Sequence, residues 1–231
     1  NVDSMQVDSI MNFVGFRTDN IDLDETETRE KYLETHIVKG DKRTQLDFNA
    51  IAQGYTVDIL IDLLVESGIE NAMVEMGGEV RCVGMNLKGL PWRIAVDKPV
   101  ISDGTGGRPL QAILEVHNAS LCTSGNYRKF KEINGVRVSH TIDPRTGYPA
   151  YHSLLSVTIQ AGSAAIADAY ATACMVLGPI EGRDFIERMR KDNSGTPIEA
   201  LFIMDAGGNS TLEEPFEFWT TSGWKETIIW L

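Results

Sequence analysis

The sequence lacks an excess of positive charge. Its 21 lysine and arginine residues stand against 33 aspartate and glutamate residues, so the formal net charge is −12. Proteins that bind nucleic acids neutralise phosphates with cationic side chains, and this balance argues against a polyanion groove. We therefore expect no nucleic-acid partner. If the ligand is a phosphate compound, a metal ion or a helix N-terminus must offset the repulsion.

Cysteines and long apolar runs are also scarce. Cys82, Cys122 and Cys174 stand singly in apolar contexts without CxxC spacing, so we interpret them as small buried hydrophobic residues and not as a zinc site. No run of about 18 apolar residues occurs, so no transmembrane helix is expected in this sequence. The opening Asn1-Val2-Asp3-Ser4 does not have the pattern of a signal peptide.

The common nucleotide-binding signatures are missing as well, because no GxGxxG opens a helix and no P-loop occurs. The 231 residues, 42% of them hydrophobic and 23% charged, are typical of a globular protein. We predict one domain over 1–231, of the α+β class, with mixed, largely antiparallel sheets and packed helices. This class follows from the number of short strands that turn signals separate.

Hydrophobic periodicity places these elements along the chain. Apolar residues at helical spacing from Ile51 to Leu64, including Tyr55, Ile59 and Leu63, predict one helix face that ends near Gly68. Other helices are predicted over 4–13, over 164–177 and over 181–190. The acidic stretch 22–34 is interpreted as a solvated connection or a hairpin. Strands are predicted over 36–38, 45–48, 72–76, 79–83, 92–96, 110–116, 120–123, 136–139, 154–160 and 200–204, and within the aromatic tail.

Two polar side chains interrupt the apolar run 164–177. Asp168 and Thr172 are four residues apart and therefore share one helix face, with roughly 5–6 Å between their Cβ atoms. An ionised carboxylate among alanine and leucine is costly unless a cation or hydrogen-bond donors satisfy it. A carboxylate and a hydroxyl are hard oxygen ligands that suit Mg²⁺. A Thr–Asp hydrogen bond on a partly exposed helix is the alternative.

Two further segments carry chemistry-bearing residues where strands end. The segment 46–58 is a predicted strand that turns directly into a helix, with Asn49 as the expected N-cap and free N–H groups for an anion. The segment 139–149 places His140 at a strand end beside a rigid Asp143-Pro144 turn, where a histidine can act as a general base. Each has a purely structural alternative: an ordinary capped turn, and a histidine that only pins the turn.

A glycine pair, Gly77-Gly78, lies between two predicted strands. Glycines at such a position let a flat ligand approach the backbone closely.

Several motifs occur together in one order along most of the chain. They are Asp-x-x-Ala-Ile-Ala-x-Gly-Tyr-x-x-Asp at 47–58, Gly-Gly-Glu at 77–79, Pro-Trp-Arg at 91–93, Thr-Ser-Gly-Asn-Tyr-Arg at 123–128, Ser-His-x-Ile-Asp-Pro-x-Thr-Gly at 139–147, and Ala-Asp-Ala-x-x-Thr at 167–172. In this order they resemble the ApbE family, the FAD:protein FMN transferases. The resemblance implies the T-fold-like α+β architecture of that family.

The resemblance also implies an activity and a set of site residues. Such enzymes transfer FMN from FAD to a threonine or serine hydroxyl of an acceptor protein and release AMP. Magnesium is held by the carbonyl at the position of Ala50 and by side chains matching Asp168 and Thr172, and a histidine matching His140 is the catalytic base. Flavin contacts are carried over to Gln53 and Ile142, and we place FAD across Gly77, Gly78 and the helix start that runs from Asn49 to Gln53.

Some expectations concern the wider context of the protein. The resemblance implies acceptor flavoprotein subunits of membrane redox complexes as partners, and a periplasmic or inner-membrane-anchored lipoprotein location. Family members usually carry a substantial N-terminal region before this point, so we expect an N-terminally truncated form. Gln53 stands where lysine or glutamate is common. Two other functions stay open: a metal-dependent FAD pyrophosphatase that gives FMN and AMP, and a flavin-binding protein without turnover.

Overall fold

The computed structural model describes residues 3–11, 14–15, 21–27, 33–100, 108–126, 130–133, 136–192, 195–207 and 215–231. Contacts divide the chain into two compact units. One comprises residues 1–47 and 143–148, and the other comprises 48–142 and 149–231. The assignment of 1–231 to one domain stays a prediction.

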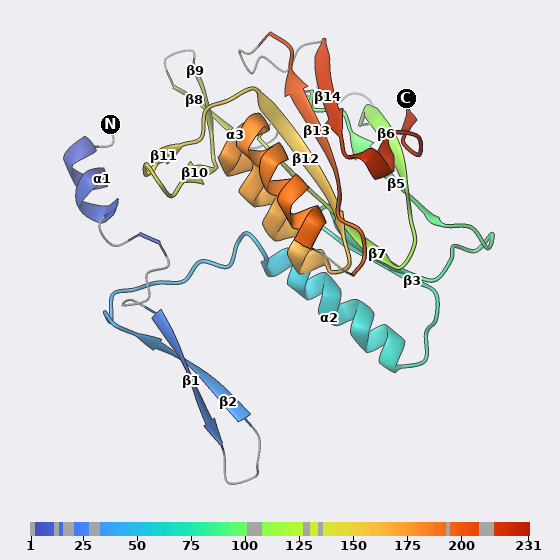
Figure 1. Ribbon diagram of the computed structural model, residues 1–231, viewed down its shortest axis with the longest axis horizontal. Coiled ribbons are helices and arrows are strands. Elements are labelled where there is room, and N and C mark those ends of the chain that lie inside the picture. Colours follow the sequence, from blue (N-terminus) through green and yellow to red (C-terminus); the bar gives the residue numbers. More distant parts are fainter. Residues whose placement is uncertain are drawn as a thin grey trace. The chain divides into compact units, whose positions relative to one another are not determined.

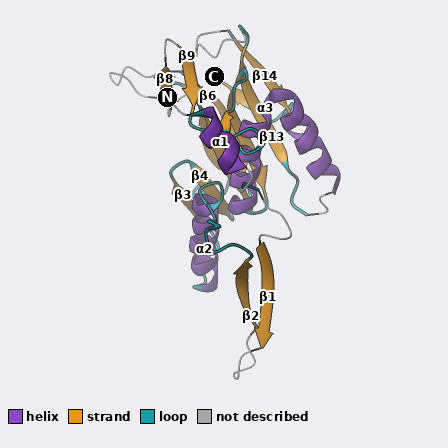
Figure 2. Ribbon diagram, turned by 90° about the vertical axis from the view of Figure 1, so that its left-hand side faces the viewer, coloured by secondary structure: helices purple, strands orange, loops and turns teal. Residues whose placement is uncertain are grey.

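The smaller unit contains a helix and a hairpin. Helix α1 spans Ser4–Met11, and β1 (Ile21–Glu27) pairs antiparallel with β2 (Leu33–Lys39), as Figure 2 shows. The acidic stretch therefore contributes to a hairpin, one of its two predicted forms. The strand predicted over 45–48 is wrong, because the partner of β2 is β1 and residues 44–48 are irregular.

The larger unit is built on a six-stranded antiparallel sheet (Figure 1). Its strand order is β14-β13-β12-β7-β4-β3, and each neighbouring pair is antiparallel. The strands are β3 (Ala72–Met76), β4 (Glu79–Val83), β7 (Ala119–Gly125), β12 (Leu154–Ala161), β13 (Glu199–Asp205) and β14 (Phe216–Thr220). All seven residues of β13 are buried, which fits a strand covered on both faces.

Side-chain alternation along β13 shows what covers each face of this sheet. Phe202 packs into a cluster with residues of α3 (Ala164–Asp192), whereas Leu201 and Ile203 pack into a cluster with the second sheet. That sheet has the order β15-β6-β5, with β5 (Trp92–Asp97), β6 (Leu110–Val116) and β15 (Ile229–Trp230). The core is thus a layer of helix, a central sheet and a smaller sheet.

Short elements complete the chain: the hairpin β8 (Phe130–Ile133) with β9 (Val136–Ser139), the pair β10 (Ile142–Asp143) with β11 (Tyr148–Pro149), and the 3-10 helix η1 (Ser222–Trp224). The predicted α+β class with largely antiparallel sheets is confirmed. Burial of all three cysteines is confirmed too. No helix in the described ranges is long and apolar enough to cross a membrane.

Helix α3 changes direction at Gly178, whose φ of 80° and ψ of −175° are not helical, and Pro179 follows. The imidazole of His152 packs against this glycine. Its Nε2 lies 2.8 Å from the Met175 carbonyl oxygen, and its Nδ1 accepts a hydrogen bond from the Leu154 amide at 3.2 Å. Nε2 therefore donates, and burial lowers the pKa of the imidazole. The kink accounts for the two helices predicted from the sequence.

Helix α2 (Ala52–Glu66) buries a different face from the one that apolar spacing marks. Tyr55, Ile59 and Leu63 are exposed by 58, 49 and 57%, respectively. The buried residues are Gly54, Val57, Asp58 and Ile61. Val57 and Ile61 are the apolar residues of this face, and the other two, Gly54 and Asp58, do not contribute to an apolar period.

Candidate functional site

The first turns of α2 and α3 meet at Gly54. A Cβ atom at this position would overlap the Ala164 carbonyl oxygen and would lie 2.6 Å from its carbonyl carbon and 2.9 Å from the Ala165 nitrogen. Only glycine permits this approach, because the opposing atoms belong to backbone that cannot rotate away. The crossing therefore brings the start of each helix within hydrogen-bond reach of the other.

Asp168 occupies this crossing. It is only 4% exposed, and its Oδ2 accepts a hydrogen bond from the Gly54 amide at 3.1 Å. Burial raises the pKa of this carboxyl, and the Gly54 hydrogen bond partly offsets the rise. Within the described part of the chain, no donor reaches its other oxygen, Oδ1. Its charge therefore has a single hydrogen-bond donor, so the site favours an additional cation.

Thr172 lies one turn further along α3, on the face that carries Asp168. Its Oγ1 is 3.2 Å from the Oγ of Ser124, which β7 supplies. The structure therefore adds a second hydroxyl to the predicted pair. Ser124 belongs to the motif at 123–128, but its motif position alone assigned it no role.

Ala50 lies in the turn that leads into α2. Helix α2 has Ile51 as its N-cap residue, with no side-chain cap, so the prediction that Asn49 caps it is wrong. The reason is that the Phe48 carbonyl accepts the amides of both Ile51 and Ala52, at 3.0 and 2.8 Å, which delays the helix by two residues. The usual partner of the Ala50 carbonyl would be the amide of Gly54.

That amide is directed to Asp168, and the described residues provide no hydrogen bond to the Ala50 carbonyl oxygen. The same interaction thus ties Asp168 to the α2 turn and leaves the nearby carbonyl oxygen able to accept a further ligand. A carbonyl, a carboxylate and a hydroxyl form a set of hard oxygen donors that fits Mg²⁺. The described residues contain no cluster of three His, Cys, Asp or Glu side chains able to hold a metal. The predicted metal-binding set of Ala50, Asp168 and Thr172 contains only one residue of these types, Asp168.

The predicted flavin contacts lie partly together. The Gln53 amide group occupies the space that a Cβ atom at Gly77 would need, so the start of α2 lies over the β3–β4 turn. Gly77 and Gly78 have φ of 70° and 116°, and the Gly78 amide donates to Glu75 Oε1 at 2.8 Å. Turn geometry and the Gln53 contact therefore account for the glycines, and close approach by a flavin stays a prediction.

His140 follows β9 directly and is exposed, in agreement with its predicted place at a strand end. Ile142, two residues later, is 49% exposed. In the described ranges no direct contact links His140 to Asp168 or Thr172, so its role as a general base stays a prediction. The Ser139 hydroxyl accepts a hydrogen bond from the Thr141 amide at 3.0 Å, which shapes the backbone on either side of His140.

The Asp-Pro turn is held by its own residues. The Asp143 carboxylate accepts hydrogen bonds from the Arg145 amide at 2.8 Å and from its Nη2 at 2.9 Å, and the Gly147 amide donates to the Asp143 carbonyl at 2.8 Å. The Arg145 guanidinium lowers the pKa of Asp143. These contacts hold the turn in its conformation.

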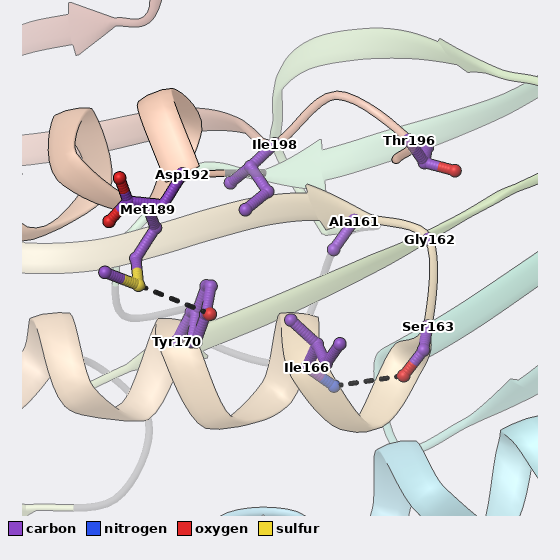
Figure 3. A pocket seen from close by; sticks show the side chains of 9 residues that line it. All are labelled: Ala161, Gly162, Ser163, Ile166, Tyr170, Met189, Asp192, Thr196 and Ile198. Atoms are coloured by element: carbon purple, nitrogen blue, oxygen red, sulfur yellow. Dashed lines mark hydrogen bonds between the residues drawn. The ribbon is translucent and has the colours of Figure 1, made fainter. Parts of the chain in front are cut away.

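A pocket of about 350 Å³ lies beside α3, lined by residues that include Ile166, Tyr170, Met189 and Asp192 (Figure 3). The Tyr170 hydroxyl donates to Met189 Sδ at 3.4 Å across it. Ile166 is two residues from Asp168, which corresponds to about 200° of rotation on a helix. The pocket therefore faces away from the Asp168–Thr172 pair and is not the predicted flavin site.

Fold and candidate site together define a class: an α+β protein in which oxygen atoms able to bind a metal ion lie where two helices begin beside an antiparallel sheet. A family model described as the ApbE family matches residues 2–195. The chain belongs to the ApbE family.

Relatives and solved structures agree with this assignment. The chain is 40% identical over 184 residues to the FAD:protein FMN transferase of Escherichia coli K12, covering 80% of this chain and 48% of that protein. It is 45% identical over 137 residues to the protein of that name from Vibrio cholerae, an alignment that covers 59% of this chain and 40% of that protein. The apo crystal structure of Pseudomonas stutzeri flavinyl transferase ApbE matches with a TM-score of 0.75 and 31% identity, over 98% of this chain and 61% of that chain. The chain spans about half the length of the curated relatives it matches.

Proposed function

We propose that this chain is part of an enzyme that transfers FMN from FAD to a threonine or serine hydroxyl of an acceptor protein, with Mg²⁺ required and AMP released. The observation that carries the proposal is the buried Asp168 carboxylate, held by one amide beside a carbonyl with no hydrogen bond from the described residues. Its relatives are named FAD:protein FMN transferase, and that name supplies the reaction class.

The residues have separate roles in this proposal. Ala50, Asp168 and Thr172 hold Mg²⁺, which supplies charge neutralisation on the pyrophosphate. His140 accepts the proton of the acceptor hydroxyl, whose oxygen forms a bond to the flavin-side phosphorus while the bond to the AMP oxygen breaks. Gln53, Gly77, Gly78 and Ile142 contact FAD. The acceptor is a flavoprotein subunit of a membrane redox complex, and the enzyme is periplasmic or a lipoprotein anchored to the inner membrane.

Mass spectrometry of a candidate acceptor after incubation with FAD and Mg²⁺ tests the reaction. A covalent FMN adduct is the expected product, and Asp168→Ala should abolish it while leaving the fold nearly intact. Free FMN and AMP without an adduct would instead identify a pyrophosphatase, in which water replaces the acceptor hydroxyl. Binding of FAD with neither product would identify a flavin-binding protein.

A further inference from the structure

Asp58, on α2, lies against the N-terminus of α3. Its two carboxylate oxygens accept hydrogen bonds from the amides of Ala164 and Ala165, each at 2.9 Å. The residue is 8% exposed. These amides belong to the first turn of α3, where no carbonyl of the same helix is available to them, so the carboxylate supplies the missing acceptor and complements the helix dipole.

A cation from the central sheet compensates for the buried charge of Asp58. Arg81, on β4, places Nη1 2.9 Å from Asp58 Oδ1 and 3.1 Å from Oδ1 of Asp62. The side chain of Asp58 is 11% exposed and that of Asp62 is 55% exposed. Arg81 therefore links sheet, α2 and α3 through Asp58, whereas its contact with Asp62 is a surface ion pair.

The two helices are tied to each other in both directions. Asp58 of α2 accepts a hydrogen bond from the first turn of α3, and Asp168 of α3 accepts one from the Gly54 amide in the first turn of α2. Gly54 and Asp58 are one turn apart on α2, and Ala164 and Asp168 are one turn apart on α3. Two fixed points one turn apart prevent α3 from sliding or rotating on α2.

We propose that Asp58 is a positioning residue, which sets the axial register of α3 so that Asp168 and Thr172 face the Ala50 carbonyl. This inference rests on the proposed cation site. A slide of one residue moves a helix by about 1.5 Å, whereas metal–ligand distances tolerate only about 0.2 Å. Asp168 cannot set this register alone, because the same carboxylate has to serve as the ligand.

Binding of Mn²⁺, a paramagnetic substitute for Mg²⁺, provides the test, measured by electron paramagnetic resonance without FAD. Asp58→Asn replaces one acceptor oxygen with an NH₂ group, which faces an amide or the Arg81 guanidinium as a second donor. We expect its Kd for Mn²⁺ to rise about 10- to 100-fold, the usual effect of losing a group that orients a metal ligand. The matched control Asp62→Asn removes only the exposed contact of Arg81, and its Kd should stay within about threefold of wild type.

Thermal unfolding of the metal-free proteins separates positioning from general stability. A lower melting temperature for Asp58→Asn with the same Kd as Asp62→Asn would overturn the inference. If Asp58→Asn does not fold, Asp58→Ala, which removes both acceptor oxygens without adding a donor, should show the same weakened binding. If wild type does not bind Mn²⁺, or Asp168→Ala binds it as well as wild type does, the cation site itself is wrong and both proposals fail.

Discussion

Gly54→Ala tests the close crossing of α2 and α3. Alanine is the better helix former by about 1 kcal/mol, so intrinsic propensity predicts a more stable protein. The new Cβ would overlap the Ala164 carbonyl and lie 2.9 Å from the Ala165 nitrogen, so one helix must move. Such overpacking costs about 1–3 kcal/mol, and loss of the charge-assisted bond to Asp168 costs about 1.5–3 kcal/mol more.

After the gain in propensity is subtracted, we expect a net loss of about 1.5–5 kcal/mol in the free energy of unfolding. For a chain of this size that corresponds to a melting temperature lower by about 3–20 °C, measurable by circular dichroism or calorimetry. Gly182→Ala is the matched control. Its Cβ would meet only side chains, the Phe202 ring at 3.1 Å and Cys174 Cβ at 3.4 Å, which can adjust. Equal stability of the two variants would refute the close approach of α2 and α3 at Gly54.

Three further predictions concern single side chains. Burial lowers the pKa of His152, so the stability that its neutral form contributes is present above the unfolded pKa of about 6.5 and is lost as pH falls through the folded pKa. His152→Gln should therefore flatten that part of a plot of unfolding free energy against pH, whereas the control His117→Gln, at an exposed position, should not. Ser124→Ala removes the hydroxyl partner of Thr172 and should weaken Mn²⁺ binding by up to about 10-fold, with stability changed by about 1 kcal/mol; unchanged affinity in a titration would contradict this. His140→Ala should lower kcat by at least about 10² while FAD and Mg²⁺ still bind, and a parallel loss of binding and melting temperature would point to a structural role.

The sequence predicted those features of the fold and site that depend on local spacing. The α+β class followed from turn signals between short apolar segments, and the Asp168–Thr172 pair followed from its four-residue spacing. The kink in α3 was anticipated as a break between two helices, because Gly178 and Pro179 are local signals of one.

Contacts that residue type and apolar spacing do not reveal account for the errors. Asn49 has the right residue type for an N-cap, but the Phe48 carbonyl forms a turn that moves the helix start to Ala52. The buried face of α2 was misassigned because tertiary contact of Gly54 with α3 outweighs the apolar spacing of Tyr55 and its neighbours. The strand at 45–48 failed because β2 already had a partner.

The separation in sequence of α2 and α3 has a consequence for synthesis of the protein. The hydrogen bond from Gly54 to Asp168 spans 114 residues, and that from Ala164 to Asp58 spans 106. At about 5–20 residues per second, a ribosome adds α3 roughly 5–20 s after α2. During that interval the Asp58 carboxylate lacks the α3 amides, and the Gly54 amide lacks Asp168. Loop closure over this distance is slow compared with helix formation. Assembly of the candidate site is therefore a late event of folding.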